Sequence, residues 1–186
     1  MSVIDQRTST YPPVTAHVPA HGFETASKDA AEIRAAFNRF PSGIAAVCAE
    51  IDGVPVGVVV SSFSVGVSFD PAIVMFSMQN SSSSWPLLRT ARSIGISVLG
   101  SDQSSVASQL ASRKGNRFRD LDISVTESGS LFLGGATLLL DCHVMSEIPA
   151  GDHHVVLLEV KSLRVESNTE PLVYHGSAFR RLHPGA

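Results

Sequence analysis

Two clusters of polar residues follow two β-rich runs of this chain. Ser61 and Ser62 end the first run, and residues 80–84, Asn-Ser-Ser-Ser-Ser, follow the apolar run 72–78. Hydroxyl groups and turn N–H groups at strand ends can hold a phosphate or another polar ligand without a net positive charge. Serine clusters also form ordinary turns. The two clusters therefore indicate candidate anion-binding loops.

The polar segment 112–120 contains the one cationic cluster of the sequence, namely Arg113, Lys114, Arg117 and Arg119. A solvated loop is the simpler interpretation on charge alone. The functional alternative is that Arg117 completes a phosphate site begun by the serines, because a guanidinium group binds phosphate in a bidentate way.

A third polar group, Gly151-Asp152-His153-His154, stands where a strand is expected to begin. Gly-Asp is common turn chemistry, and a histidine at a strand start usually belongs to a polar surface. The functional hypothesis is that His153 lines a pocket at the mouth of a barrel.

Other chemistries have weaker support in the sequence. There is no G-x-S-x-G segment for a serine nucleophile and no G-x-G-x-x-G segment for a Rossmann nucleotide site. Histidine and cysteine spacing does not favour a metal site, and His17 and His21 are expected to be solvated. Cys48 and Cys142 lie in apolar runs, which predicts buried free thiols and a reducing, cytoplasmic location.

Composition limits the class of protein. The chain has 186 residues, 44% of them hydrophobic, and a net charge of −3, which predicts one well-packed domain. The absence of a basic patch argues against nucleic acid as the main partner. The sequence has no apolar run long enough for a membrane span and no apolar signal-peptide core near Met1.

The elements that would position these residues are mostly short strands. Residues 1–28 are expected to form a flexible arm that could pack across a partner subunit, followed by one domain over 29–186. A helix is predicted over 29–40, capped by Ser27 or Asp29, with Ile33, Ala36, Phe37 and Phe40 on one face. Further helices are predicted over 85–91, capped by Ser84, and over 103–111, capped by Ser101 or Asp102. Strands are expected at 44–51, 55–63, 65–68, 72–78, 94–99, 123–125, 131–133, 136–145, 154–167 and 172–175.

Turns separate these strands. Asp52-Gly53 is a strong hairpin signal, and a turn is expected over 147–152, which contains Pro149. Many short strands at close spacing, with few helices, predict a closed or nearly closed antiparallel barrel.

Several sequence blocks, taken in order, resemble one known family. The blocks are Phe37-x-x-Phe40-Pro41-x-Gly43, Gly57-x-x-x-Ser61-Ser62-Phe63, Ser68-Phe69-Asp70-Pro71, Asn80-x-Ser82-x-Ser84, Val98-Leu99 with Asp102-Gln103, Gly151-Asp152-His153, and Pro171-Leu172-Val173-Tyr174 with Phe179-Arg180. Together they are similar to the short-chain flavin reductases, the reductase components of two-component flavin-dependent monooxygenases.

The resemblance implies a mainly β fold, a split antiparallel β-barrel of the Greek-key, FMN-binding type with a few peripheral helices, usually as a homodimer. It implies that Val60, Ser61 and Ser62 approach the isoalloxazine ring and that Asn80, Ser82 and Ser84 hold the ribityl chain and phosphate. Arg117 is then a phosphate partner in a loop, 113–118, that closes over the flavin. The remaining cofactor-binding residues are Ser81, Trp85 and Phe118. His153 is implied on the nicotinamide side, as both catalytic and cofactor-binding residue.

The chain departs from the common family pattern at a few positions. Segment 64–68 is one residue longer than usual, which predicts a bulge. Val59 and Ser84 stand where threonine is frequent, and Leu158 stands where glycine is common.

The leading hypothesis is an NAD(P)H-dependent flavin reductase that passes reduced FMN or FAD to a partner oxygenase. The choice between FMN and FAD, and between NADH and NADPH, stays open. One alternative is a flavin-binding electron-transfer module, and another is an FMN-dependent oxidase on the same barrel, because fold likeness does not separate these functions.

Overall fold

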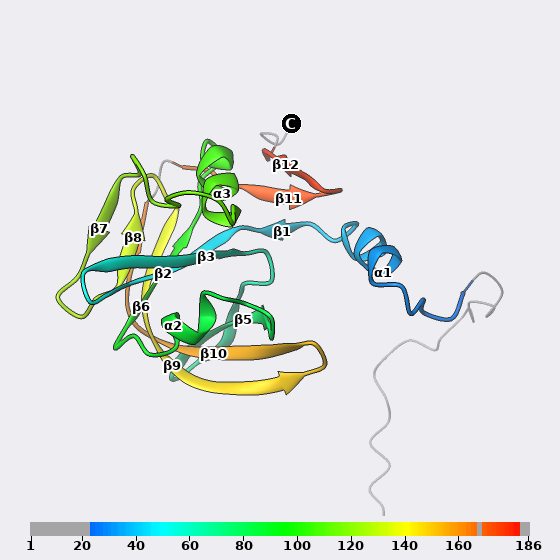
Figure 1. Cartoon of the computed structure of the whole chain (residues 1–186), viewed down its shortest axis with the longest axis horizontal. Coiled ribbons are helices and arrows are strands. Elements are labelled where there is room, and N and C mark those ends of the chain that lie inside the picture. The colour runs from blue at the N-terminus through cyan, green and yellow to red at the C-terminus, as the bar shows by residue number, and fades with distance from the viewer. Residues whose placement is uncertain (1–22, 167–168, 183–186) are drawn as a thin grey trace, which may run out of the picture.

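A computed structural model describes residues 23–166 and 169–182, and the described chain is mainly β (Figure 1). Residues 1–22 of the predicted arm lie outside the described residues, and these include His17 and His21. The helices are α1 (Ala30–Phe37), α2 (Trp85–Leu88) and α3 (Ser104–Ala111). The strands are β1 (Ser42–Gly43), β2 (Ala45–Ile51), β3 (Val54–Val60), β4 (Ser64–Phe69), β5 (Ala72–Gln79), β6 (Ile94–Val98), β7 (Ile123–Val125), β8 (Leu131–Leu133), β9 (Leu138–Ala150), β10 (His153–Val165), β11 (Val173–His175) and β12 (Ala178–Arg180).

Seven strands form one curved antiparallel sheet in the order β3-β2-β6-β9-β10-β5-β4. Its longest pair is the β9–β10 hairpin, in which each strand has 13 residues. Strands β3 and β4 are the two edges of this sheet, so the barrel is split between them. The predicted split antiparallel barrel is confirmed.

A side chain bridges the split. Ser62, just after β3, accepts a hydrogen bond from the main-chain N–H of Ser77 on β5 at 2.9 Å and donates to the Ser77 carbonyl at 3.1 Å. The hydroxyl of Ser62 thus satisfies two strand groups that a neighbouring strand would otherwise pair.

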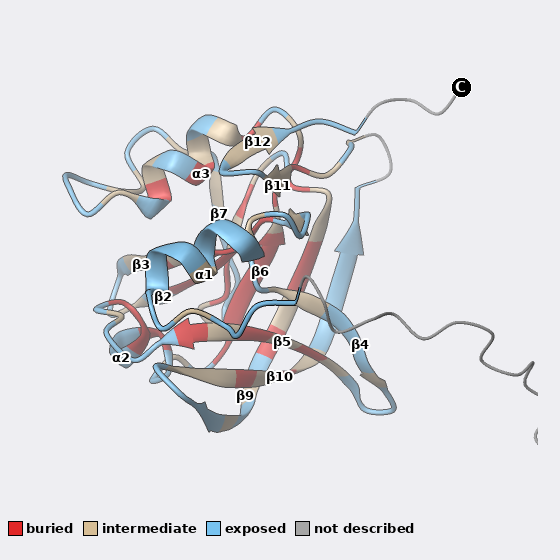
Figure 2. Cartoon of the chain, turned by 90° about the vertical axis from the view of Figure 1, so that its right-hand side faces the viewer, coloured by how far each residue is buried: buried red, intermediate tan, exposed pale blue. Residues whose placement is uncertain are grey.

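Strand β2 is buried on both faces over residues 45–49, which explains why this part of the strand is entirely apolar; Glu50, which follows, is exposed. Ala45, Val47 and Ala49 face the barrel interior, where they pack with Phe76, Ile96, Val156 and other side chains. Ala46 and Cys48 face a second core, beneath α3 and β8, with Leu99, Leu110, Leu131 and Leu172. Figure 2 shows these buried strands running through the centre of the molecule.

Two small sheets and the first helix surround the barrel. Strand β1 pairs with β11, which pairs with β12, and β7 pairs with β8. Helix α1 lies to one side of the barrel (Figure 1), and none of its residues is buried (Figure 2). Its predicted apolar face is present, but Phe37 and, just beyond the helix, Phe40 are 72% and 75% exposed.

Several local predictions are confirmed. Asp29 caps α1, because its carboxylate accepts the Ala31 N–H at 2.7 Å. Asp52 and Gly53 both have positive φ, 51° and 77°, as expected for a tight hairpin turn. The β4–β5 register shifts between Ser64 and Ser68, where the bulge was expected.

One local prediction is confirmed only in part, and two are wrong. Ser84 stands at the N-cap position of α2, as predicted, but its side chain makes no capping hydrogen bond: its hydroxyl accepts from Arg117, and the Ser82 hydroxyl accepts the Trp85 N–H. Neither Ser101 nor Asp102 caps α3, which begins after Gln103. The expected turn over 147–152 is confined to Gly151 and Asp152, since β9 continues through Ala150. Proline is tolerated there because β6 pairs only with residues 138–142 of β9, which leaves Pro149 on a free edge.

Among the residues that the structure describes, no helix is both long and apolar enough to cross a bilayer.

Candidate functional site

An open cleft of about 580 Å³ lies at the split of the barrel. The ends of β3 and β5, the serine loop (residues 80–84), the end of α3 and the arginine loop (residues 112–121) surround it. The lining residues are Val58, Val59, Val60, Ser61, Ser62, Ser77, Met78, Gln79, Ser81, Ser82, Ser83, Ser84, Leu110, Ala111, Arg113, Arg117 and His153.

One side of the cleft, which we name the anion end, is formed by the pair of Arg117 and Ser84. The Arg117 guanidinium donates from Nη1 to the Ser84 hydroxyl at 3.0 Å and to the Gly57 carbonyl at 3.3 Å. Arg117 is half-buried and has no acidic partner within ion-pair distance among the described residues. A cation beside several hydroxyls, without a carboxylate to neutralise it, suits an anionic ligand group.

The position of Arg117 depends on a missing side chain at Gly57. A Cβ at Gly57 would lie 2.7 Å from the Phe118 ring and 2.6 Å from the Cys48 sulfur. Glycine therefore lets Phe118 pack directly over β3, and the neighbouring Arg117 reaches the strand backbone. Gln109 of α3 supports the same loop by donating to the main-chain carbonyls of Arg117, at 3.1 Å, and Arg119, at 2.8 Å.

A second part of the cleft, which we name the histidine end, is the start of β10. His153 lines the cleft, and its Nδ1 lies 2.7 Å from the Asp152 carboxylate. Because a carboxylate only accepts, Nδ1 carries the proton and Nε2 is the nitrogen that Asp152 leaves free. The hydrogen bond and the charge of His153 lower the pKa of Asp152 below its usual value.

Residues after β3 line the cleft between these two ends. Val60 is buried, whereas Ser61 and Ser62 are exposed. The Ser62 hydroxyl is already bonded to Ser77, so this side chain holds the wall of the cleft together.

The structure brings eight of the eleven predicted site residues to the cleft: Val60, Ser61, Ser62, Ser81, Ser82, Ser84, Arg117 and His153. The other three lie off its lining. Trp85 is buried in the barrel core and donates to Glu147 at 3.0 Å. Phe118 lines a smaller neighbouring hollow beside Gly57. Asn80 faces the β9–β10 hairpin.

Several lining residues were not predicted individually. Ser77 follows from the alternation of β5, in which Ser77 and Gln79 lie on the face opposite Phe76 and Met78. Arg113 belongs to the cationic segment. Leu110 and Ala111 had no sequence signal, because only the packing of α3 against the barrel brings its end to the cleft.

Other groups with reactive side chains serve the fold. Burial raises the pKa of both the Cys48 and the Cys142 thiol to about 12, so neither is an activated nucleophile. Both are buried and free, as predicted. Ser93, Ser130 and Asp141 form a buried hydrogen-bonded cluster that joins β6, β8 and β9, and no histidine is among its described partners.

Fold and cleft together define a class: a split antiparallel barrel with an open cleft whose arginine and serine hydroxyls suit an anionic ligand group. A comparison with family models then identifies the family. The chain belongs to the flavin reductase like domain family, whose model matches residues 37–183. The resemblance seen in the sequence blocks is thereby confirmed.

Individual relatives span most of the chain. A flavin reductase from Pseudomonas putida is 33% identical over 147 residues, which cover 78% of this chain and 86% of the relative. A protein of Streptomyces coelicolor named actinorhodin polyketide dimerase is 34% identical over 155 residues, with 83% and 87% covered. The reductase subunit HsaB of a flavin-dependent monooxygenase of Mycobacterium tuberculosis is 30% identical over 162 residues, with 86% of each chain covered.

A solved structure supports the same fold. The NADH:FAD oxidoreductase SgcE6 of Streptomyces globisporus, in complex with NAD and FAD fragments, superimposes with a TM-score of 0.82 at 28% identity. The match covers 88% of this chain and 99% of SgcE6.

Proposed function

We propose that the protein is an NAD(P)H:flavin oxidoreductase that reduces FMN or FAD and supplies the reduced flavin to a partner monooxygenase. The observation that carries this proposal is the cleft itself, with an unneutralised arginine among serine hydroxyls at one end and a histidine of fixed tautomer at the other. Family membership and the names of the relatives support the same chemistry.

The residues of the anion end fit a flavin phosphate. Three groups can serve it: the Arg117 guanidinium, the Ser84 hydroxyl and the exposed serines of the same loop. The cleft volume of about 580 Å³ is in the range of small-molecule sites, roughly 300–1,000 Å³. Arg117 and Ser84 are then the groups that hold the phosphate, while Ser61 and Val60 present main-chain atoms to the rest of the ligand.

The histidine end serves the nicotinamide side. A flavin accepts a hydride from reduced nicotinamide and so becomes a two-electron carrier. The part of this chain is to orient the two ligands, since hydride transfer needs them closely stacked. Asp152 holds the His153 ring in one tautomer, and Nε2 stays available to a ligand in the cleft.

Transfer of the reduced flavin to an oxygenase rests on the relatives and on the open cleft. HsaB is named as the reductase subunit of a flavin-dependent monooxygenase. A second candidate function has one observation in its favour, namely the relative named for dimerising a polyketide. In that case the protein would use its flavin on an organic substrate itself.

We further propose that the chain works as a homodimer in the cytoplasm. Large apolar side chains are exposed on α1, on β4 and at the end of β10; they include Phe37, Val65, Phe69, Leu163 and Val165. Surfaces of this kind are typical of protein interfaces. Light scattering of the purified chain tests the dimer, and a monomeric mass at micromolar concentration would contradict it. The free thiols fit a reducing compartment.

The deciding experiment follows the absorbance of NADH or NADPH at 340 nm with purified protein and added FMN, FAD or riboflavin. Fast loss of nicotinamide absorbance that depends on added flavin is the expected result. A protein that retains its flavin but oxidises no nicotinamide would favour the electron-transfer or oxidase alternative. No flavin binding would overturn the proposal.

A further inference from the structure

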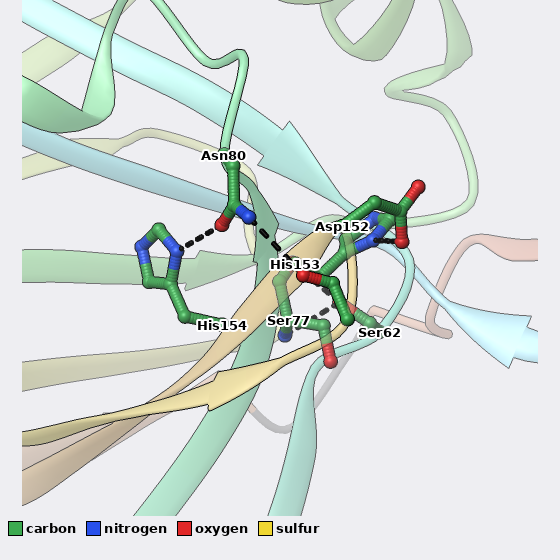
Figure 3. A network of polar contacts seen from close by, with 7 residues as sticks. Ser62, Ser77, Asn80, Asp152, His153 and His154 are labelled. Carbon is green, nitrogen blue, oxygen red and sulfur yellow. Dashed lines mark hydrogen bonds and ion pairs between the residues drawn. The ribbon is translucent and has the colours of Figure 1, made fainter.

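Asn80 stands at the start of the serine loop, immediately after β5, but it faces away from the cleft. Its main-chain N–H donates to the Asp152 carbonyl at 3.0 Å. Its side-chain amide donates to the Gly151 carbonyl at 3.3 Å, and its Oδ1 lies 2.9 Å from Nδ1 of His154 (Figure 3). Two of these contacts go to the turn residues Gly151 and Asp152, and the third goes to His154 at the start of β10.

The side chain of Asn80 has one carbonyl oxygen and one NH₂ group, and the hairpin engages both. The amide orientation is set by its partners, since the Gly151 carbonyl can only accept a hydrogen bond. Oδ1 therefore faces His154, whose Nδ1 must donate to it. Asn80 thus uses one amide N–H and one Oδ1 lone pair on the hairpin, and its side chain faces the hairpin and not the cleft.

The side chain of His154 lies on the face of β10 that points away from the cleft, and it links Asn80 to further residues. Its ring is mostly buried and lies beside Trp85, with 6.2 Å between the ring centroids. Nε2 lies 3.3 Å from the Glu147 carboxylate, a distance that allows an ion pair, although the angle does not meet hydrogen-bond geometry.

Glu147 of β9 contacts residues that follow the C-terminal end of the serine loop. Its carboxylate accepts from the Trp85 indole at 3.0 Å and pairs with Arg89 at 3.0 Å. Both ends of the serine loop thus contact the β9–β10 hairpin, through its first residue, Asn80, and through Trp85, which directly follows it. The same hairpin carries His153.

We propose that Asn80 and His154 are positioning residues that fix the serine loop, and hence the anion end, relative to His153. This inference rests on the proposed function and assigns neither residue a contact with flavin or nicotinamide. The alternation of side chains along β10 explains why the adjacent residues His153 and His154 have different roles. Adjacent residues of β10 point to opposite faces, so His153 faces the ligand while His154 holds the loop.

The test compares variants of the full chain in turnover and in flavin binding. For Asn80→Ala we expect kcat to fall roughly 10-fold, because small misplacements of reacting groups cost this much or more. We expect the Kd values for FMN and riboflavin to rise by the same small factor, about 3-fold or less. If Asn80 instead contacted the flavin phosphate, Asn80→Ala would weaken FMN binding selectively. If Asn80 contacted the ribityl chain, the variant would weaken the binding of both flavins with little change in kcat.

Two substitutions at His154 sharpen the test. Asparagine places its NH₂ near the position of the histidine Nδ1, so His154→Asn should retain most of kcat by keeping the bond to Asn80. His154→Ala should reproduce the loss of Asn80→Ala, and the double alanine variant should be no worse than either single variant. Asn38→Ala is the matched control, because Asn38 also joins two segments, through Ser177, but lies away from the cleft.

Hydrogen exchange gives a second readout that does not depend on activity. In Asn80→Ala, amide exchange should accelerate together in residues 81–85 and 151–154 and stay unchanged in β2. An active wild type with unchanged kcat and exchange in Asn80→Ala overturns this inference alone. An inactive wild type that binds no flavin overturns the proposed function, and exchange then still decides whether Asn80 links the two segments.

Discussion

At the anion end of the cleft, Arg117 meets Ser84 across 33 residues of sequence, whereas at the histidine end His153 meets its immediate neighbour Asp152. The first contact depends on the packing of Phe118, Gly57 and Cys48 in a buried layer. The second lies on an exposed turn. The anion end is therefore held by the core, and substitutions there should affect both stability and binding. Substitutions at the histidine end should affect turnover with little loss of stability.

The strongest way to break the anion end is to fill the space at Gly57. Gly57→Val should lower the free energy of unfolding by about 1–3 kcal/mol, as overpacking usually does, and should displace Phe118 and Arg117. The affinity for FMN should then fall by a larger factor than the affinity for riboflavin. Thermal unfolding and flavin titration measure the two effects.

Gly43→Ala is the control for this substitution, because nothing lies within 4 Å of a Cβ at Gly43 and its φ is not positive. If Gly57→Val unfolds no more easily than Gly43→Ala, the close packing of Phe118 on β3 is not what positions the arginine loop.

Arg117→Ala should weaken FMN binding roughly 10- to 100-fold, since a hydrogen bond to a charged group contributes about 1.5–3 kcal/mol. Riboflavin lacks the phosphate and should lose much less. Isothermal titration with both flavins measures the difference. Arg119→Ala, in the same loop but lining a separate hollow with Gln109 and Asp120, should bind both flavins as the wild type does. Equal losses of FMN and riboflavin in Arg117→Ala would remove Arg117 from the phosphate site.

His153→Ala should lower kcat with NADH about 10-fold while FMN affinity changes less than 3-fold, because the side chain lies at the nicotinamide end. Steady-state kinetics at saturating flavin give the first number, and titration gives the second. His143→Ala is the control, since His143 is an exposed strand histidine outside the cleft. Unchanged kinetics in His153→Ala would exclude a role for this residue in turnover.

The smallest expected effect concerns Asp152. Its pKa is lowered in the folded chain, so the contact with His153 stabilises the fold above the ordinary carboxyl pKa of about 4 and is lost as pH falls through the lowered value. Wild type and Asp152→Asn should therefore differ slightly in unfolding temperature at pH 6, and the difference should shrink as the pH falls below 4. A difference that does not shrink below pH 4 would mean that the carboxylate charge is not its source.

Local patterns in the sequence predicted much of the fold and part of the site. The Asp52-Gly53 turn, the Asp29 cap and the bulge near Ser64 each follow from residues close together in the chain. The serine clusters and His153 were found because polar residues at strand ends stand out against apolar runs.

What the sequence did not predict depends on tertiary contacts. Ser84 has the residue type and position of a helix cap, but its hydroxyl accepts a hydrogen bond from Arg117. The Ser82 hydroxyl accepts the Trp85 N–H of the helix instead. Asn80 matches a ligand motif, yet its amide faces the hairpin turn. In both cases a distant partner competes for the same polar atoms, and no local pattern reveals that partner.

The hydroxyl of Ser62 has a mechanical consequence. Separating β9 from β10 would break a ladder that runs along two 13-residue strands. Where the barrel is split, the two hydrogen bonds between Ser62 and Ser77 join its sides, and each contributes only about 1 kcal/mol net. Ser62→Ala would therefore remove both of these hydrogen bonds at the split and leave the β9–β10 ladder intact.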